Sequence, residues 1–356
     1  VRPFKEIEAY LKSAQQKGQQ IHYLPTYRAE HQLKLFAWLG VMPGAEQPSV
    51  PFILGVVNQR NYKSAEEIAE IEKACVVTAD MHLAAMRTVR PGIRESEVAA
   101  VVAEAAFKHN YELSFPIIAT VNGQTLHNHD HSNLIKPGDM LLLDAGAETE
   151  MGYAGDMSST MPADKKFTQR QRDVYDIQVA AHEAAVAALR PGIKFVDVYE
   201  KSCAVIMEGM KSLGFAKGDP MEAVKAGAHA MFMPCGLGHM MGLDVHDMEN
   251  LGEVYVGYNG QPKSTQFGRK SLRLGRELEP GFVLTIEPGI YFIPELIDLW
   301  RSEHKFTEFL NYDKLETYKD FSGIRNEEDY LITEDGARLL GKKIPLHAED
   351  VEKEHC

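Results

Sequence analysis

Four acidic residues of this sequence lie inside or at the ends of short apolar runs, where a charged side chain needs a partner. The runs are LLLD, YAGDMSST, VLTIEPGIY and GIRNEEDYLIT, and the acids are Asp144, Asp156, Glu287 and Glu327. An isolated charge buried in a strand is costly. Taken singly, each acid is more often a turn residue or a solvated edge residue. With the glycine-flanked His239 they form a set of four carboxylates and one imidazole, which needs a common explanation.

This donor set predicts a metal site that performs hydrolysis. Carboxylate oxygens and an imidazole nitrogen suit manganese, iron, cobalt or zinc. The number of ligands favours two ions that share bridging carboxylates, and such a pair lowers the pKa of a bound water molecule enough to supply hydroxide at neutral pH. The stretch PCGLGHMMGLDVHD leaves a second interpretation open, because Cys235 and His246 flank His239 and a thiolate-containing zinc site uses the same residue types.

Helices that could position these residues occur twice in the sequence. One begins with capping-box spacing at Ser64 and a second at Thr168, and each ends at an RPGI motif, at residues 90–93 and 190–193. A second amphipathic helix follows each motif, at residues 95–109 and 197–213. This repetition predicts an internal duplication. We expect an α+β domain in which two helix pairs cover one face of an antiparallel sheet, with the site in the groove between its halves.

Extended runs separated by glycines follow each helix pair. They are predicted at residues 114–125, 140–149 and 152–162 in the first half, and at 232–242, 282–292 and 324–334 in the second. In the first half, Asp144 and Asp156 fit a hairpin with its turn near residues 149–152. Such a hairpin brings both aspartates to the same end of adjacent strands.

Composition excludes several classes of partner. The chain has 38 Lys and Arg against 51 Asp and Glu, a net charge of −13, and no basic block, so nucleic acid and anionic membranes are poor partners. No membrane-spanning or signal segment is expected. The cysteines are scattered and form no CxxC pair, which indicates a reducing, cytoplasmic environment. They are Cys75, Cys203, Cys235 and Cys356.

Four segments resemble, in order, the signature segments of the pita-bread metallopeptidases, in their proline-specific branch of prolidases and aminopeptidases P. They are DAGAETEMGYAGDMSSTMP, PCGLGHMMGLDVHD, LEPGFVLTIEPGIYF and SGIRNEEDYLIT, and the resemblance runs from about residue 64 to 340. It implies a pita-bread fold with a pseudo-two-fold repeat. The implied domains are a partial, truncated N-terminal domain (1–63), a catalytic domain (64–345) and a C-terminal tail (346–356). It also implies a homodimer when the protein is full length.

The resemblance assigns roles to the residues that match the family motifs. The implied ligands of two divalent ions, manganese foremost, are Asp144, Asp156, His239, Glu287 and Glu327, with Asp156 and Glu327 bridging. Glu287 would also manage the proton of the attacking water. His246 would face the scissile carbonyl and donate to the oxyanion.

Three further residues match substrate-side groups of the family. His127 matches a substrate-side histidine; with His129 and His131 it could instead form an HxHxH metal motif, and solvated loop histidines are the simpler account of the outer two. Arg325 resembles the arginine that braces the metal-site carboxylates beside the substrate, or is only a strand-end charge. Arg273 matches the arginine that pairs with the free carboxylate of a dipeptide; its alternative is a surface-loop arginine.

The implied function is hydrolysis of Xaa-Pro bonds in short, proline-containing peptides. The segment 291–325 resembles a prolidase insertion and favours an Xaa-Pro dipeptidase. The alternatives are an Xaa-Pro aminopeptidase acting on longer peptides and a non-catalytic peptide-binding module. A metal-free creatinase-like activity does not fit the intact ligand set.

The sequence departs from the family pattern at three places. Cys235 stands where this branch usually has a histidine, Asn326 replaces an apolar residue, and the Asp144 to Asp156 hairpin is one residue longer than usual. The ligands themselves survive these changes. The change at Cys235 predicts an activity that is weaker or shifted in substrate.

Overall fold

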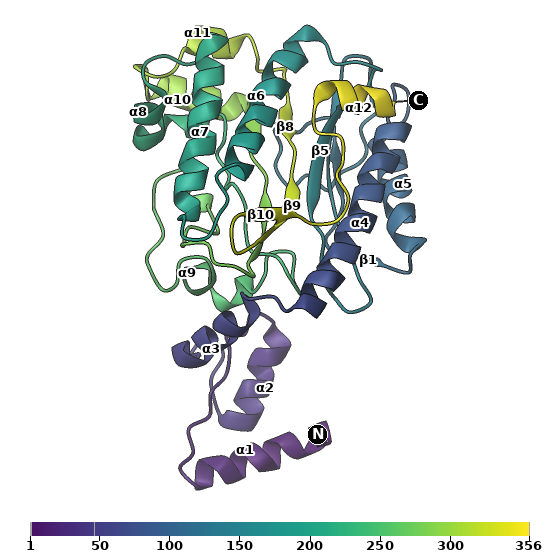
Figure 1. Cartoon of the computed structure of the whole chain (residues 1–356). Coiled ribbons are helices and arrows are strands. Elements are labelled where there is room, and N and C mark those ends of the chain that lie inside the picture. The colour runs from purple at the N-terminus through teal and green to yellow at the C-terminus, as the bar shows by residue number, and fades with distance from the viewer. Residues whose placement is uncertain (1, 46, 356) are drawn as a thin grey trace.

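The computed structural model describes residues 2–45 and 47–355, so Cys356 lies outside the described residues. Three helices form the N-terminal segment: α1 (Ile7–Gln16), α2 (Ala29–Leu39) and α3 (Val50–Arg60). Figure 1 shows this segment at one end of the molecule, with α3 nearest to the remaining helices and strands. The side-chain hydroxyl of Ser49 caps α3 by accepting from the Phe52 N–H.

The two predicted helix pairs are present, and their starts follow from local capping chemistry. They are α4 (Ala65–Thr88) with α5 (Glu95–Phe107), and α6 (Gln169–Val186) with α7 (Phe195–Ser212). Ser64 and Glu67 form a reciprocal capping box at α4, and Thr168 and Gln171 form one at α6. In the view of Figure 1, α6 and α7 lie at the left and α4 and α5 at the right, with β5, β8 and β9 between the two pairs.

The strands are short and form four small antiparallel sheets, ordered β1-β4, β2-β3-β5, β10-β9-β6 and β7-β8. Their bounds are β1 Glu112–Leu113, β2 Ile118–Thr120, β3 Met140–Ala145, β4 Ala147–Glu148, β5 Met157–Pro162, β6 Val283–Ile286, β7 Gly289–Tyr291, β8 Gly323–Arg325, β9 Glu328–Ile332 and β10 Ala337–Leu339. A bridge between Ser158 and Glu327 joins β5 to the chain between β8 and β9. Strands from the two halves of the sequence therefore meet at this point.

The predicted strand at residues 232–242 is wrong. This segment runs beside β6, and its only β-pairing among the described residues is the isolated bridge from Met240 to Leu284. The His239 N–H donates to the Thr285 hydroxyl at 3.2 Å instead of to a strand carbonyl. A Cβ on Gly238 would lie 2.1 Å from the Thr285 carbonyl oxygen. Three backbone hydrogen bonds nevertheless join the segment to β6 and to the residue after it: Met241 N–H donates to the Val283 carbonyl, Thr285 N–H to the His239 carbonyl and Glu287 N–H to the Leu237 carbonyl.

Five further α-helices occur in the described residues, and most of their contacts are with other helices. They are α8 (Pro220–Ala226), α9 (Glu253–Val256), α10 (Pro294–Ser302), α11 (Tyr312–Glu316) and α12 (Ala348–Glu354). Helix α12 lies in the segment expected to be a tail; it packs near α4 and α6 and forms ion pairs from Glu354 to Arg87 and from Glu349 to Arg172. Within residues 2–45 and 47–355, no helix is both long and apolar enough to cross a membrane.

Candidate metal centre

The β3–β5 hairpin places the first two acidic residues as predicted. Asp144 pairs with Ser158 across the two strands, and Asp156 immediately precedes β5. The turn closes where expected, with the Gly152 N–H donating to the Thr149 carbonyl at 2.8 Å. Both aspartates therefore lie at one end of adjacent strands.

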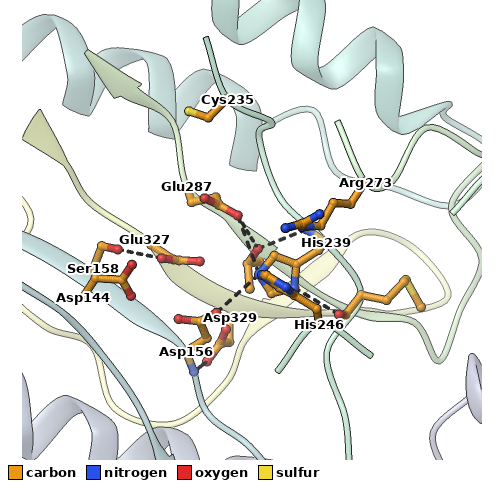
Figure 2. Close-up of polar contacts among 12 residues, drawn as sticks. Asp144, Asp156, Ser158, Cys235, His239, His246, Arg273, Glu287, Glu327 and Asp329 are labelled. Atoms are coloured by element: carbon orange, nitrogen blue, oxygen red, sulfur yellow. Dashed lines mark hydrogen bonds and ion pairs between the residues drawn. The ribbon is translucent and has the colours of Figure 1, made fainter. Parts of the chain in front are cut away.

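The second half of the chain brings the other acids to the same place. Glu287 follows β6, and Glu327 lies between β8 and β9, where its N–H donates to the Ser158 carbonyl at 2.9 Å. Ligand atoms of Asp156, His239 and Glu327 all lie within 4.8 Å of one another, and no other such group of three occurs in the described parts of the chain. Figure 2 shows Asp144 and Glu287 flanking this cluster.

His239 is oriented as a metal ligand. Its Nδ1 lies 3.0 Å from the carbonyl of Met240 and donates to it, because a carbonyl can only accept. Its Nε2 then presents a lone pair 3.3 Å from Asp156 Oδ2 and 3.6 Å from Glu287 Oε1. A ligating histidine is usually held in this way by a hydrogen bond from its other nitrogen.

All five predicted ligands line one cavity of about 260 Å³. The same cavity is lined by His127, His129, Cys235, His246, Tyr291 and Arg325. Arg273 is absent from this lining; it borders a small adjoining pocket together with His239 and His246. The structure therefore brings together every predicted site residue except Arg273, which lies at the margin.

The cluster is strongly acidic and withdrawn from water. Burial raises the pKa of Asp156, and the neighbouring Asp144 raises it further. Burial also raises the pKa of Glu327, with contributions from Asp156 and Glu287. Burial raises the pKa of Glu287 to about 7. These shifts mean that the carboxylates repel one another and attract a cation.

Arg325 offsets part of this negative charge. Its Nη2 donates to Asp144 Oδ2 at 2.7 Å, its Nε to Ser158 Oγ at 2.9 Å and its Nη1 to Tyr291 Oη at 2.7 Å. A planar guanidinium suits three such partners in fixed directions. Arg325 thus lies beside the carboxylates, where a bracing arginine would have to be. Ser158 and Tyr291 are partners that the sequence did not identify.

The donor set fits divalent metal. Asp144 Oδ1 and Asp156 Oδ1 are buried and receive no hydrogen bond from any described residue. Buried carboxylate oxygens without donors are otherwise costly, so a cation accounts for them. The Asp156 backbone is fixed because its N–H donates to Asp329 Oδ2 at 3.0 Å. Asp329 was not predicted, although an acid two residues after Glu327 was visible in the motif GIRNEEDYLIT.

His246 lies against the metal centre through the turn that follows His239. The two rings meet edge to face with centroids 4.4 Å apart. His246 Nδ1 lies 3.0 Å from Glu249 Oε2, and burial lowers the pKa of His246. Glu249 also lies 3.0 Å from Arg273 Nη1, which in turn donates to Glu253 at 2.7 Å. Glu249 was not predicted, although an acid three residues after a candidate histidine was visible in VHDMEN.

The three histidines near residue 127 do not share a strand face, because they lie in a loop. His127 has a φ of +56° and lines the cavity, and burial lowers its pKa. His131 Nε2 instead lies 3.0 Å from the Ile117 carbonyl. The HxHxH interpretation therefore has no support in the geometry of these described residues.

Cys235 lines the cavity without joining the ligand cluster. Its Sγ lies 4.0 Å from Tyr291 Oη, and Figure 2 shows it set apart from the carboxylates. Burial raises its pKa to about 12, so it is a thiol and not a thiolate near neutral pH. The thiolate-zinc interpretation of PCGLGHMMGLDVHD is therefore not supported.

The chain is similar in sequence to known metallopeptidases. The profile of metallopeptidase family M24 matches residues 69–334. The chain is 34% identical over 302 residues to the Xaa-Pro aminopeptidase of Escherichia coli, and 31% identical over 305 residues to the Xaa-Pro dipeptidase of Homo sapiens. Each alignment covers 83% of this chain, and the chain spans about 60% of the length of these relatives.

Solved structures show the same likeness. Proline aminopeptidase P II from Yersinia pestis matches with a TM-score of 0.77 and 30% identity, over 99% of this chain and 75% of that one. A Glu383Ala variant of Escherichia coli aminopeptidase P in complex with substrate matches with a TM-score of 0.75 and 30% identity, over 94% of this chain and 70% of that one. These likenesses confirm the α+β pita-bread fold expected from the sequence.

Proposed function

The chain belongs to metallopeptidase family M24, and from this premise we propose that it hydrolyses Xaa-Pro peptide bonds, with Xaa-Pro dipeptides as its substrates. One observation carries the proposal: four carboxylates, three of them buried and Glu287 partly buried, and an oriented imidazole converge on a cavity that three further histidines also line. The relatives named as Xaa-Pro peptidases supply the substrate class.

In this proposal Asp144, Asp156, His239, Glu287 and Glu327 hold two divalent ions. Such ions, when bound, lower the pKa of a water molecule and polarise the scissile carbonyl. Glu287, with a pKa of about 7, accepts the proton of the attacking water and returns it to the proline nitrogen as the C–N bond breaks. One water is thereby divided between the new carboxyl group and the released amine.

His246 and His127 act on the substrate side of the cavity. His246 faces the carbonyl oxygen, and its ring is held by Glu249 Oε2, which lies 3.0 Å from Nδ1. Burial lowers the pKa of His246, so the ring donates to the developing oxyanion in the form that carries its proton on Nε2. Arg325 holds Asp144 in place beside the substrate and keeps water from that carboxylate.

Arg273 is proposed to bind the free carboxylate of a dipeptide. One observation favours the second candidate, an Xaa-Pro aminopeptidase that acts on longer peptides. Arg273 Nη1 is already engaged by both Glu249 and Glu253, so a substrate carboxylate must compete with two acids for this guanidinium. A longer peptide, whose carboxylate lies farther away, avoids this competition.

Finer assignments belong to the same proposal. Manganese suits the oxygen-rich donor set. A cytoplasmic location is consistent with the free thiols of Cys75, Cys203 and Cys235. We assign catalysis to residues 64–345, and to residues 1–63 a role in closing the groove and in forming a homodimer of the full-length protein.

Paired substrates separate the two candidates. The manganese-loaded protein is incubated with Gly-Pro and with a tripeptide that has proline second, and proline or dipeptide release is measured. Release from Gly-Pro at the higher kcat/KM supports the dipeptidase. Hydrolysis of the tripeptide alone selects the aminopeptidase, and hydrolysis of neither peptide contradicts both.

A further inference from the structure

Asp247, the residue after His246, is buried and held by two cations from the junction that follows α3. Lys63 Nζ lies 2.9 Å from Asp247 Oδ2, and Arg60 Nη2 lies 2.5 Å from Asp247 Oδ1. The Lys63 and Asp247 side chains are 2% and 1% exposed. Arg60 also pairs with Asp244 at 3.1 Å. A buried ion pair of this kind needs a reason, because burial of both charges is expensive.

The pair closes the turn that carries His246 back to His239. Within this turn the Asp247 N–H donates to the Met240 carbonyl at 2.9 Å. A Cβ on Gly242 would lie 2.8 Å from Asp247 Oδ2 and 2.9 Å from Lys63 Cε. Because Gly242 has no side chain, Lys63 has room to contact Asp247.

The cationic side of the pair is itself fixed. The Lys63 N–H donates to the Gly281 carbonyl at 2.9 Å, and its Nζ donates to the Arg60 carbonyl at 2.6 Å. Arg60 is the last residue of α3, and Ser64 caps α4 one residue after Lys63. The pair thus connects the His246 turn to a junction between two helices.

We propose that Lys63 and Arg60 are positioning residues that act through Asp247 to hold His246 at the metal centre. Neither cation lines the cavity, so any effect on the reaction passes through the turn. Misplacement of a catalytic group by about 1 Å can reduce turnover about 100-fold. The activity readout of this inference rests on the proposed peptidase function.

A double-mutant cycle tests whether Lys63 acts through His246. Lys63→Met is made in the wild-type protein and in a His246→Ala background, and kcat and KM for Xaa-Pro substrate are measured with manganese. We expect kcat to fall about 10- to 100-fold in the wild-type background and less than about 2-fold in the His246→Ala background. An equal loss in both backgrounds would overturn the inference.

Two further variants guard against a simple folding effect. Lys73→Met removes an exposed cation paired with Glu70 and is the matched control; it should leave kcat unchanged. Arg60→Met breaks the ion pairs of Arg60 with Asp247 and Asp244 but keeps the buried pair of Lys63 with Asp247, so it should lower kcat by a smaller factor. If Lys63→Met does not fold, Arg60→Met in the two backgrounds decides the question by the same criterion.

Hydrogen exchange gives a readout that does not need catalysis. Amides of residues 240–248 should exchange about 10-fold faster in Lys63→Met than in Lys73→Met, because the turn loses its anchor. If the wild-type protein hydrolyses no peptide but the exchange rates of the two variants differ in this way, the proposed peptidase function is wrong and the positioning role of Lys63 is still supported. Exchange at the same rate in both variants overturns the anchor whatever the activity.

Discussion

Arg325 Nη2 donates to Asp144 Oδ2 at 2.7 Å in the site, and among the described residues that line the cavity no other lysine or arginine accompanies the four carboxylates. The same guanidinium bonds Ser158 and Tyr291. Because it touches both halves of the duplicated fold, its loss should affect stability as well as chemistry.

Arg325→Met should destabilise the metal-free protein by about 3–5 kcal/mol, because removal of one partner leaves a buried carboxylate unpaired. The free energy of unfolding is measured by urea denaturation after dialysis against chelator. Arg87→Met, which removes an exposed ion pair with Glu354, is the control and should cost about 1 kcal/mol or less. Equal losses for the two variants would contradict the bracing role of Arg325.

Glu287 should give the metal-free protein a pH-dependent instability. Its pKa is about 7 in the folded protein against 4.5 for the ordinary group, so the folded state holds a proton that the unfolded state has lost between these values. Stability therefore falls as pH rises from about 4.5 to about 7, by about 3 kcal/mol in total.

The Glu287→Gln variant isolates this effect, because it lacks the titrating group. Urea denaturation of both metal-free proteins from pH 5 to pH 8 should show wild type losing stability relative to Glu287→Gln as pH rises. Parallel pH profiles for the two proteins would show that the pKa of Glu287 is not raised.

Much of the fold could be predicted because its signals are local. The capping boxes at Ser64 and Thr168 mark the helix starts, and the hairpin between Asp144 and Asp156 follows from its turn and strand lengths. In place of the strand predicted at residues 232–242 there is an irregular segment, in which the His239 N–H donates to the Thr285 hydroxyl while other backbone groups keep hydrogen bonds to β6. Periodicity cannot register such a contact between segments distant in sequence.

That the candidate ligands lie together at one cavity could be predicted from the sequence, whereas the contacts that support them could not. Each predicted acid interrupts an apolar run, which is visible in the sequence. The contact from Lys63 to Asp247 spans 184 residues, and the bond from Arg325 to Tyr291 spans 34. The sequence around either residue of such a pair does not indicate which distant residue it will contact. The resemblance supplied the roles of His246 and Arg273, while the position of Glu249 between them required the structure.

Arg273→Ala should weaken the binding of a dipeptide, whose free carboxylate Arg273 is proposed to bind, more than the binding of a tripeptide. Loss of a charged hydrogen bond predicts a rise in KM for Gly-Pro of about 10-fold or more, with little change for a proline-second tripeptide. Arg269→Ala is the matched control, because Arg269 lies nearby in sequence and pairs with Glu200 outside the cavity. A rise in KM that is equal for both peptides would remove Arg273 from dipeptide selection.

Cys235→His should raise kcat/KM for Xaa-Pro substrates by about 2- to 10-fold, the value of one added hydrogen bond. The thiol that lines the cavity has a pKa of about 12 and is a weak donor, whereas an imidazole at this place can donate to substrate. Cys235→Ser controls for loss of the thiol alone. A fall in kcat/KM would show that the cavity accommodates the smaller cysteine side chain better than an imidazole.

The metal-dependent hydrolysis of Gly-Pro tests the central claim most directly. Proline release is measured with the protein as purified, after chelation, and after manganese is restored, with bound metal counted in each sample. The account predicts two ions per chain, loss of proline release on chelation and its recovery with manganese. Proline release that persists without metal, or that is absent from protein carrying two ions, would contradict it.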